Sequence, residues 1–167
     1  MTSFSPGILD LASSVLESCR TRRLGIVTAE SCTGGLIIGA MTAVPGSSDV
    51  VDRGFVTYTN EAKTEMLDVS ADLIAAHGAV SEPVARAMAA GALKHSHAGV
   101  SIAVTGIAGP TGGTPGKPVG LVHIAAARRD GATAHERRVF DGDRDAVRHQ
   151  TVSTALRLVQ QLVREIS

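Results

Sequence analysis

The sequence predicts a single α/β domain, folded as a three-layer α/β/α sandwich around a mixed β-sheet. The length of 167 residues is that of one domain. Short apolar runs, typical of strands buried on both faces, alternate with segments of helical periodicity. Asp130-Gly131 lies between two strand-like runs and indicates a hairpin, so the sheet contains antiparallel strands. We therefore expect one domain over residues 1–167, with helices on both faces of the sheet.

The first quarter of the chain predicts a helix, a strand and a second helix. After Ser5, apolar residues recur at helical spacing up to residue 19. Residues 24–28 are a short apolar run, which predicts a buried strand. A turn is predicted at residues 29–33, and helical periodicity returns over residues 34–41.

The rest of the chain predicts four more strands, four more helices and one long loop. The strands are expected at residues 50–58, 100–104, 119–127 and 133–140. Helices are expected to begin near Asn60, Ser70 and Ser81, which can cap a helix, and after residues 141–143. Residues 106–118 are rich in Gly and Pro and predict a loop without regular structure.

Composition argues against several classes of partner. Basic and acidic side chains balance to a formal net charge of zero, which gives no overall field for nucleic acid or anionic membranes. With no Trp, one Tyr and three Phe, the chain has few side chains on which bases could stack. No signal peptide or membrane span is apparent, and the two cysteines suit free thiols in a reducing compartment. We expect a cytoplasmic protein with no nucleic acid or membrane partner.

Ser31 is the first candidate for chemistry, because it lies at a turn between a predicted strand and a predicted helix. Ligands of open α/β sheets usually bind at the carboxyl ends of such strands. Thr33, Gly34 and Gly35 follow, and the two glycines would let the backbone approach a substrate. Free N–H groups in the first helical turn would stabilise an oxyanion. The alternative is that Ser31 or Thr33 merely caps the helix.

Lys63 is the candidate base for Ser31, because no histidine lies nearby in the sequence. A lysine near a helix N-terminus faces the positive end of the helix dipole, and burial would further disfavour its charged form. The alternative is an ordinary exposed lysine. Cys32 is interpreted as structural, and His95 with His97 lacks the further ligands that a metal site needs, so no metal or other cofactor is expected.

Two further segments suit a small anionic ligand. The segment with Thr105, Gly106 and Gly109 offers backbone N–H groups as a cradle, although it does not match a P-loop. Arg144 and Arg148 are four residues apart at the start of the last helix and would share a face, which suits a phosphate. A plain connecting loop and a salt-bridged surface patch, respectively, are the alternatives.

Together these segments resemble the CinA C-terminal domain family over nearly the whole chain. The resemblance rests on TAESCTGG at 28–35, GFVTYTNEAK at 54–63, HGAVSE at 77–82, TGIAGP at 105–110 and GDRDAVR at 142–148. It implies hydrolysis of nicotinamide mononucleotide to nicotinate mononucleotide and ammonia, in pyridine-nucleotide salvage. It also implies a metal-free mechanism with Ser31 as nucleophile and Lys63 as base.

The resemblance further implies that Tyr58 helps to orient the site, and that Arg144 or Arg148 suits the phosphate. A homo-oligomer, with a dimer favoured, is expected from the family and the apolar composition. Thr111 and Gly116 depart from the acidic residues frequent in relatives, so contacts of this loop with substrate are not carried over. The pyrophosphatase activity linked to an additional N-terminal domain is not expected either.

The sequence therefore supports two hypotheses. The first is a Ser-Lys amidohydrolase, which requires the Ser31 hydroxyl within hydrogen-bond reach of the Lys63 amine. The second is a non-catalytic module of the same family that binds a nucleotide or a partner, in which Ser31 only caps a helix.

Overall fold

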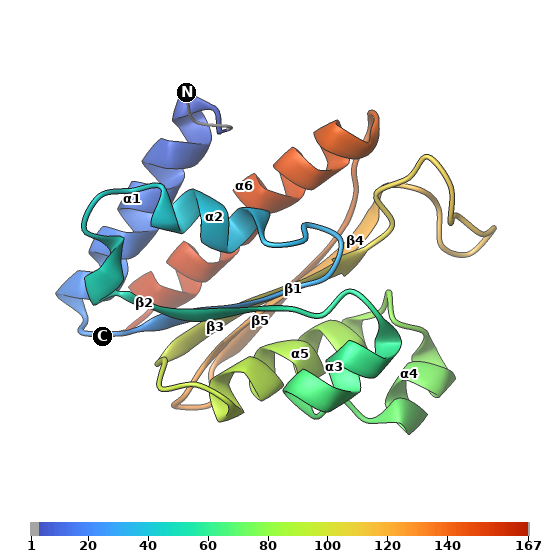
Figure 1. Ribbon diagram of the computed structural model, residues 1–167, viewed down its shortest axis with the longest axis horizontal. Coiled ribbons are helices and arrows are strands. Elements are labelled where there is room, and N and C mark those ends of the chain that lie inside the picture. The colour runs from blue at the N-terminus through green and yellow to red at the C-terminus, as the bar shows by residue number, and fades with distance from the viewer. Residues whose placement is uncertain (1–3, 167) are drawn as a thin grey trace.

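A computed structural model describes residues 4–166 as one five-stranded sheet between two layers of helices (Figure 1). The strands are β1 (Ile26–Glu30), β2 (Val51–Val56), β3 (Val100–Gly106), β4 (Leu121–Arg128) and β5 (Thr133–Val139). Their order across the sheet is β2-β1-β3-β4-β5. Strands β2, β1 and β3 run parallel, whereas β4 and β5 pair antiparallel, so the predicted mixed sheet is confirmed.

Helices cover both faces of this sheet. They are α1 (Pro6–Thr21), α2 (Leu36–Thr42), α3 (Asn60–Leu67), α4 (Ala71–His77), α5 (Glu82–Lys94) and α6 (Arg144–Arg164), with a short 3₁₀ turn η1 (Ser47–Asp49). Helices α1, α2 and α6 lie on one face, and α3, α4 and α5 on the other (Figure 1). The three-layer sandwich predicted from the sequence is therefore confirmed.

Each face of the sheet has its own hydrophobic core. Strand residues with side chains on one face, such as Ile26 and Ile102, pack with α1, α2 and α6. Their neighbours on the other face, such as Val27 and Ala103, pack with α4 and α5. Burial on both faces explains why these strands are continuous apolar runs in the sequence, without alternation of polar residues.

Two local predictions were wrong in detail. The first strand is shifted, because Glu30 remains in β1, opposite Val56 and Val104, and is fully buried. The α3 cap is Thr59, whose hydroxyl accepts from the N–H of Ala62, and not Asn60, which is the first helical residue. The Asp130-Gly131 hairpin is confirmed, with Gly131 at a φ of 101°.

The parallel strands place three chain segments at one edge of the sheet. The carboxyl ends of β1, β2 and β3 lie at the same edge of the sheet. Ser31 follows β1, Thr57 follows β2, and Gly106 ends β3. Because β4 runs back from this edge, the loop between β3 and β4 also lies here (Figure 1). The segments that sequence analysis selected for chemistry thus converge.

Candidate active site

Ser31 is the first residue after β1, and the sheet holds it in place. Its N–H donates to the carbonyl of Val104 on the neighbouring strand β3, over 3.1 Å. The carbonyl of Ser31 accepts from the N–H of Gly34 at 3.0 Å, which closes a tight turn before α2. Only 8 % of Ser31 is exposed, so this residue is buried at the edge of the sheet and does not lie on the open surface.

The amine of Lys63 lies against this hydroxyl, with 3.0 Å between Lys63 Nζ and Ser31 Oγ. The amine also donates to the carbonyl of Thr57 at 2.8 Å and to that of Tyr58 at 3.4 Å. Side chains of a helix lean toward its N-terminus, which explains how a residue in α3 reaches carbonyls that precede the helix. The contact that the amidohydrolase hypothesis requires is therefore present.

Burial makes the charged form of Lys63 unfavourable. The side chain is only 1 % exposed, and this desolvation lowers the pKa of its amine below the ordinary lysine value. Among residues 4–166, no carboxylate forms an ion pair with it. A neutral amine has two N–H donors and one lone pair, which match the two carbonyls and the Ser31 hydroxyl proton. The geometry thus suits a lysine that accepts a proton from Ser31.

The neighbouring thiol of Cys32 is a poorer nucleophile here. Cys32 is buried, and burial raises the pKa of its thiol to about 12. A thiol with such a pKa stays protonated at neutral pH, and the thiolate is the reactive form of cysteine. The structural interpretation of Cys32 agrees with this environment.

A cavity of about 350 Å³ opens above the Ser31–Lys63 contact. Of the predicted site residues, seven line this cavity and four do not. The seven are Ser31, Tyr58, Lys63, Thr105, Gly106, Gly109 and Arg144. The cavity is also lined by Cys32, Asn60, Ala79, Val80, Ile107, Ala108, Thr111 and Gly112. Segments from five parts of the chain therefore form a single site.

Arg144 and Tyr58 stand together at the rim of the cavity. The guanidinium of Arg144 donates to the Tyr58 hydroxyl at 3.1 Å and to the carbonyl of Gly109 at 2.8 Å. Tyr58 lines the cavity and is 60 % exposed, so it does not belong to the core. A cationic group at this rim, with the Ser31–Lys63 pair below it, suits a ligand whose anionic end remains near the surface.

Thr33, Gly34, Gly35 and Arg148 lie behind the cavity and not on its wall. Gly35 adopts a φ of 102° at the start of α2, which a side chain would strain. The hydroxyl of Thr33 donates to Glu30 at 2.7 Å. The guanidinium of Arg148 donates to the carbonyls of Cys32 and Thr33. These four residues therefore shape the Ser31 turn.

The N–H groups of the first turn of α2 do not face the cavity. The amides of Ile37 and Ile38 donate to the carboxylate of Glu30, at 2.8 and 3.1 Å. The amide of Leu36 donates to the carbonyl of Thr33. The expectation that these groups stabilise an oxyanion was wrong, because they already have acceptors.

Glu30 is the main residue that sequence reasoning missed. Its carboxylate is fully buried and accepts hydrogen bonds from two hydroxyls and two amides, those of Thr28, Thr33, Ile37 and Ile38. A negative charge beside the N-terminus of α2 is also favoured by the helix dipole. A glutamate a few residues before a predicted helix was the available signal.

The part of the cavity wall formed by Ala79 and Val80 was also missed. Ala79 and Val80 precede α5, and the hydroxyl of Thr105 holds this segment by donating to the carbonyl of Ala79 at 2.9 Å. Asn60 was interpreted only as a helix cap, yet it lines the cavity. Small apolar residues in a loop carry no sequence signal for such a role.

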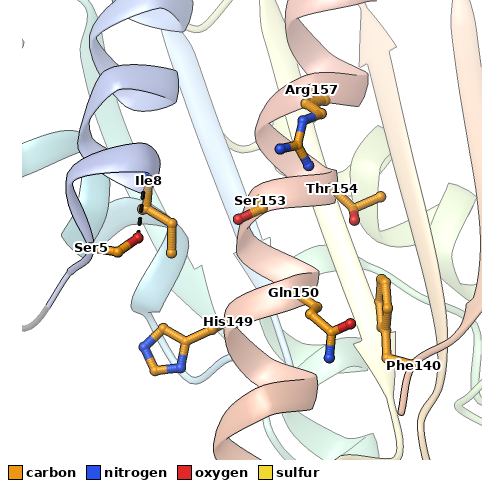
Figure 2. Close-up of a pocket in the computed structure, with 8 residues that line it drawn as sticks. All are labelled: Ser5, Ile8, Phe140, His149, Gln150, Ser153, Thr154 and Arg157. Atoms are coloured by element: carbon orange, nitrogen blue, oxygen red, sulfur yellow. Dashed lines mark hydrogen bonds between the residues drawn. The ribbon is translucent and has the colours of Figure 1, made fainter. Parts of the chain in front are cut away.

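Another cavity, of about 470 Å³, lies on the outer face of α6 (Figure 2). It is lined by Ser5, Ile8, Phe140, His149, Gln150, Ser153, Thr154 and Arg157. The only hydrogen bond drawn between these residues joins the Ile8 amide to Ser5 Oγ, which caps α1 (Figure 2). None of its hydroxyls is hydrogen-bonded to a buried lysine as Ser31 is, so the Ser31 cavity is the stronger candidate site.

The described residues contain neither a cluster of metal ligands nor a helix that could span a membrane. Within residues 4–166, no group of three or more His, Cys, Asp or Glu side chains is arranged to hold a metal ion. His95 instead contacts Asp68, with 2.7 Å between Nε2 and Oδ2. No helix within these residues has both the length and the hydropathy to cross a bilayer.

The fold and the site define a class of protein. It is an α/β/α sandwich in which a serine hydroxyl and a buried lysine amine meet at the carboxyl edge of a mixed sheet. The chain belongs to the family of the CinA C-terminal domain, whose model matches residues 8–163. The family that the sequence motifs indicated is thereby confirmed.

This chain matches three relatives over nearly all of its own length, but over different shares of theirs. It is 46% identical over 154 residues to the nicotinamide-nucleotide amidohydrolase PncC of Escherichia coli strain K12, covering 92% of this chain and 93% of that protein. A CinA-like protein of Anaeromyxobacter sp. strain K is 48% identical over 161 residues, and the match spans 39% of its length. The crystal structure of competence/damage inducible protein CihA from Agrobacterium tumefaciens superposes with a TM-score of 0.95 at 48% identity, covering 99% of this chain and 100% of that one.

We predict that Glu30→Gln destabilises the protein. A glutamine offers one acceptor oxygen where four donors converge, and its NH₂ group would face donors. The free energy of unfolding should fall by about 2–4 kcal/mol in urea denaturation, as expected when a buried charged hydrogen-bond network is broken. Glu65→Gln, on the exposed surface of α3, is the control and should change little. Equal stability of both variants would show that the carboxylate does not hold α2.

Proposed function

We propose that this protein hydrolyses the carboxamide of nicotinamide mononucleotide to nicotinate mononucleotide and ammonia, as a step of pyridine-nucleotide salvage. The observation that carries the proposal is the contact between the Ser31 hydroxyl and the buried Lys63 amine, inside a cavity with a cationic rim. The similarity to E. coli PncC supports the substrate. The chain spans 39% of the Anaeromyxobacter relative, so the activity of that whole protein is not transferred.

In the proposed first half-reaction, Lys63 removes the proton of Ser31 while Oγ attacks the carboxamide carbon. The new C–O bond converts the carbonyl into a tetrahedral oxyanion. When this intermediate collapses, the C–N bond breaks, and the nitrogen takes the proton from Lys63 and leaves as ammonia. An ester between Ser31 and the nicotinate group remains, and Lys63 is neutral again.

In the second half-reaction, a water molecule replaces ammonia. Lys63 removes a proton from the water, whose oxygen attacks the ester carbon. Collapse of the second intermediate breaks the bond to Ser31 Oγ, which recovers its proton from Lys63. The sum is consumption of one water and release of nicotinate mononucleotide and ammonia, with both side chains restored.

The rim residues are proposed to hold the phosphate end of the substrate. Arg144 is the cationic residue that lines the cavity, and a guanidinium binds phosphate oxygens through parallel N–H donors. Tyr58, hydrogen-bonded to Arg144, would orient this guanidinium and cover the bound substrate. Thr105, Gly106 and Gly109 would contact the substrate along the adjacent wall. The homo-oligomer and the cytoplasmic location stay predictions from the sequence.

We predict that Ser31→Ala and Lys63→Ala each lower turnover of nicotinamide mononucleotide at least about 1,000-fold, because each removes a partner of the covalent step. Ammonia and nicotinate mononucleotide are quantified with the purified protein. Ser153→Ala and Lys94→Ala, which lie outside the cavity, are the matched controls and should retain activity. Unchanged turnover in Ser31→Ala would favour the alternative, a non-catalytic binding module.

We predict that activity falls as the solution becomes more acidic, because Lys63 must be neutral to accept a proton. Its pKa lies below the ordinary lysine value of 10.5, so kcat/KM should rise with pH and level off below that value. His123, which pairs with Thr105 across β3 and β4, has a pKa lowered to about 4 by burial. The acidic limb should therefore persist in His123→Gln. Loss of the limb in that variant would assign the proton acceptor to histidine.

We predict that Arg144→Ala weakens binding of the mononucleotide without stopping the chemistry. Loss of a charge-assisted contact to phosphate should raise KM about 10- to 100-fold, with a smaller effect on kcat. The nucleoside that lacks the phosphate should show nearly the same kcat/KM in both proteins. An equal loss for nucleotide and nucleoside would contradict a phosphate role for Arg144.

A further inference from the structure

Arg148 connects α6 to the turn that carries Ser31. Its Nε donates to the carbonyl of Cys32 at 3.2 Å, and its Nη2 donates to the carbonyl of Thr33 at 3.1 Å. The side chain is half-buried and does not line the Ser31 cavity. Both donors are therefore directed at main-chain atoms, and the phosphate-binding role considered from the sequence does not fit this placement.

The two carbonyls that Arg148 binds are the central ones of the Ser31 turn. The N–H of Gly34 donates to the carbonyl of Ser31 across this turn, and the N–H of Ser31 is bound to β3. On the other side, Glu30 holds the hydroxyl of Thr33. The orientation of every peptide group in the turn is thus fixed by a partner outside it or across it.

This arrangement leaves the N–H groups of Cys32 and Thr33 without an acceptor among residues 4–166, and of these two residues only Cys32 lines the cavity. In a planar trans peptide the N–H points away from the preceding carbonyl, so the Cys32 N–H points away from the Ser31 carbonyl that binds Gly34. Within residues 4–166, no other residue accepts from the Cys32 N–H, and Cys32 lines the cavity beside Ser31. An amide next to a nucleophilic serine is well placed to bind the oxygen on which negative charge develops.

We infer that Arg148 is a positioning residue, which holds the Ser31 turn so that Ser31 Oγ and the Cys32 N–H act on the same carboxamide. The hydroxyl attacks the carbon while the N–H stabilises the oxyanion that forms. Arg148 itself touches neither substrate nor reacting atoms. This inference rests on the proposed function, and it assigns the two arginines of α6 different tasks, since Arg144 contacts the substrate phosphate.

Arg148→Ala and Arg148→Lys test the inference by steady-state kinetics with nicotinamide mononucleotide. We expect Arg148→Ala to lower kcat about 30- to 300-fold with KM changed less than about twofold, because a misplaced oxyanion donor affects the transition state alone. Arg148→Lys keeps the charge but cannot bridge two carbonyls with a planar fork, so it should remain impaired. Added guanidinium ion should partly restore kcat of Arg148→Ala. Arg157→Ala, on the outer face of α6, is the control (Figure 2).

The competing roles give different results. If Arg148 bound the phosphate, Arg148→Ala would raise KM and leave kcat unchanged. If Arg148 were purely structural, Arg148→Ala would lower the melting temperature and leave kcat and KM unchanged. Either result overturns the inference. If Arg148→Ala does not fold, Arg148→Lys with its melting temperature decides in the same way. Labelling of Ser31 by a fluorophosphonate, followed by intact mass, provides a readout that needs no substrate. Slower labelling in both variants supports positioning even if wild-type protein fails to hydrolyse nicotinamide mononucleotide, which would reject the proposed function alone.

Discussion

The buried amine of Lys63 is the constraint on which the site depends. An amine with almost no exposure and no carboxylate partner is unfavourable when charged, and its three contacts are two carbonyls and one hydroxyl. These contacts require the end of β2, the first turns of α3 and the end of β1 to stay in register. The same burial that costs stability at low pH lowers the pKa of the amine, so a larger fraction of it carries the lone pair that a base for Ser31 needs.

Two charged side chains, Glu30 and Arg148, hold the Ser31 turn and the start of α2 in place. Glu30 fixes the N-terminus of α2 from within the sheet, and Arg148 fixes the turn from α6. The two side chains bind different kinds of main-chain group. Glu30 accepts hydrogen bonds from amides, whereas Arg148 donates hydrogen bonds to carbonyls. A turn held in this way resists rearrangement when a substrate arrives, and such preorganisation is what makes hydrogen-bond donors effective at a reacting centre.

The sequence predicted the fold better than it predicted the contacts of the site. Apolar runs, capping residues and the Asp130-Gly131 pair report local preferences, and these determined the sandwich and the mixed sheet. It could not predict Glu30 inside β1, because a glutamate after an apolar run is interpreted as the start of a turn. Only the structure reveals the four donors that allow this carboxylate to be buried. Nor could spacing distinguish the role of Arg144 from that of Arg148, since residues four apart share a helix face. In the structure, Arg144 donates to the carbonyl of Gly109, whereas Arg148 donates to carbonyls of the Ser31 turn.

The mixed sheet also explains why the glycine-rich loop covers the site. Strand β3 ends at the same edge as β1 and β2, and β4 starts there and runs back, so their connection begins and ends at this edge (Figure 1). Two backbone bonds between Ile107 and the residues Gly120 and Leu121 close the base of this loop. In an all-parallel sheet the chain after β3 would leave the edge through a crossover helix. The antiparallel return instead keeps residues from the 106–112 segment in the cavity wall.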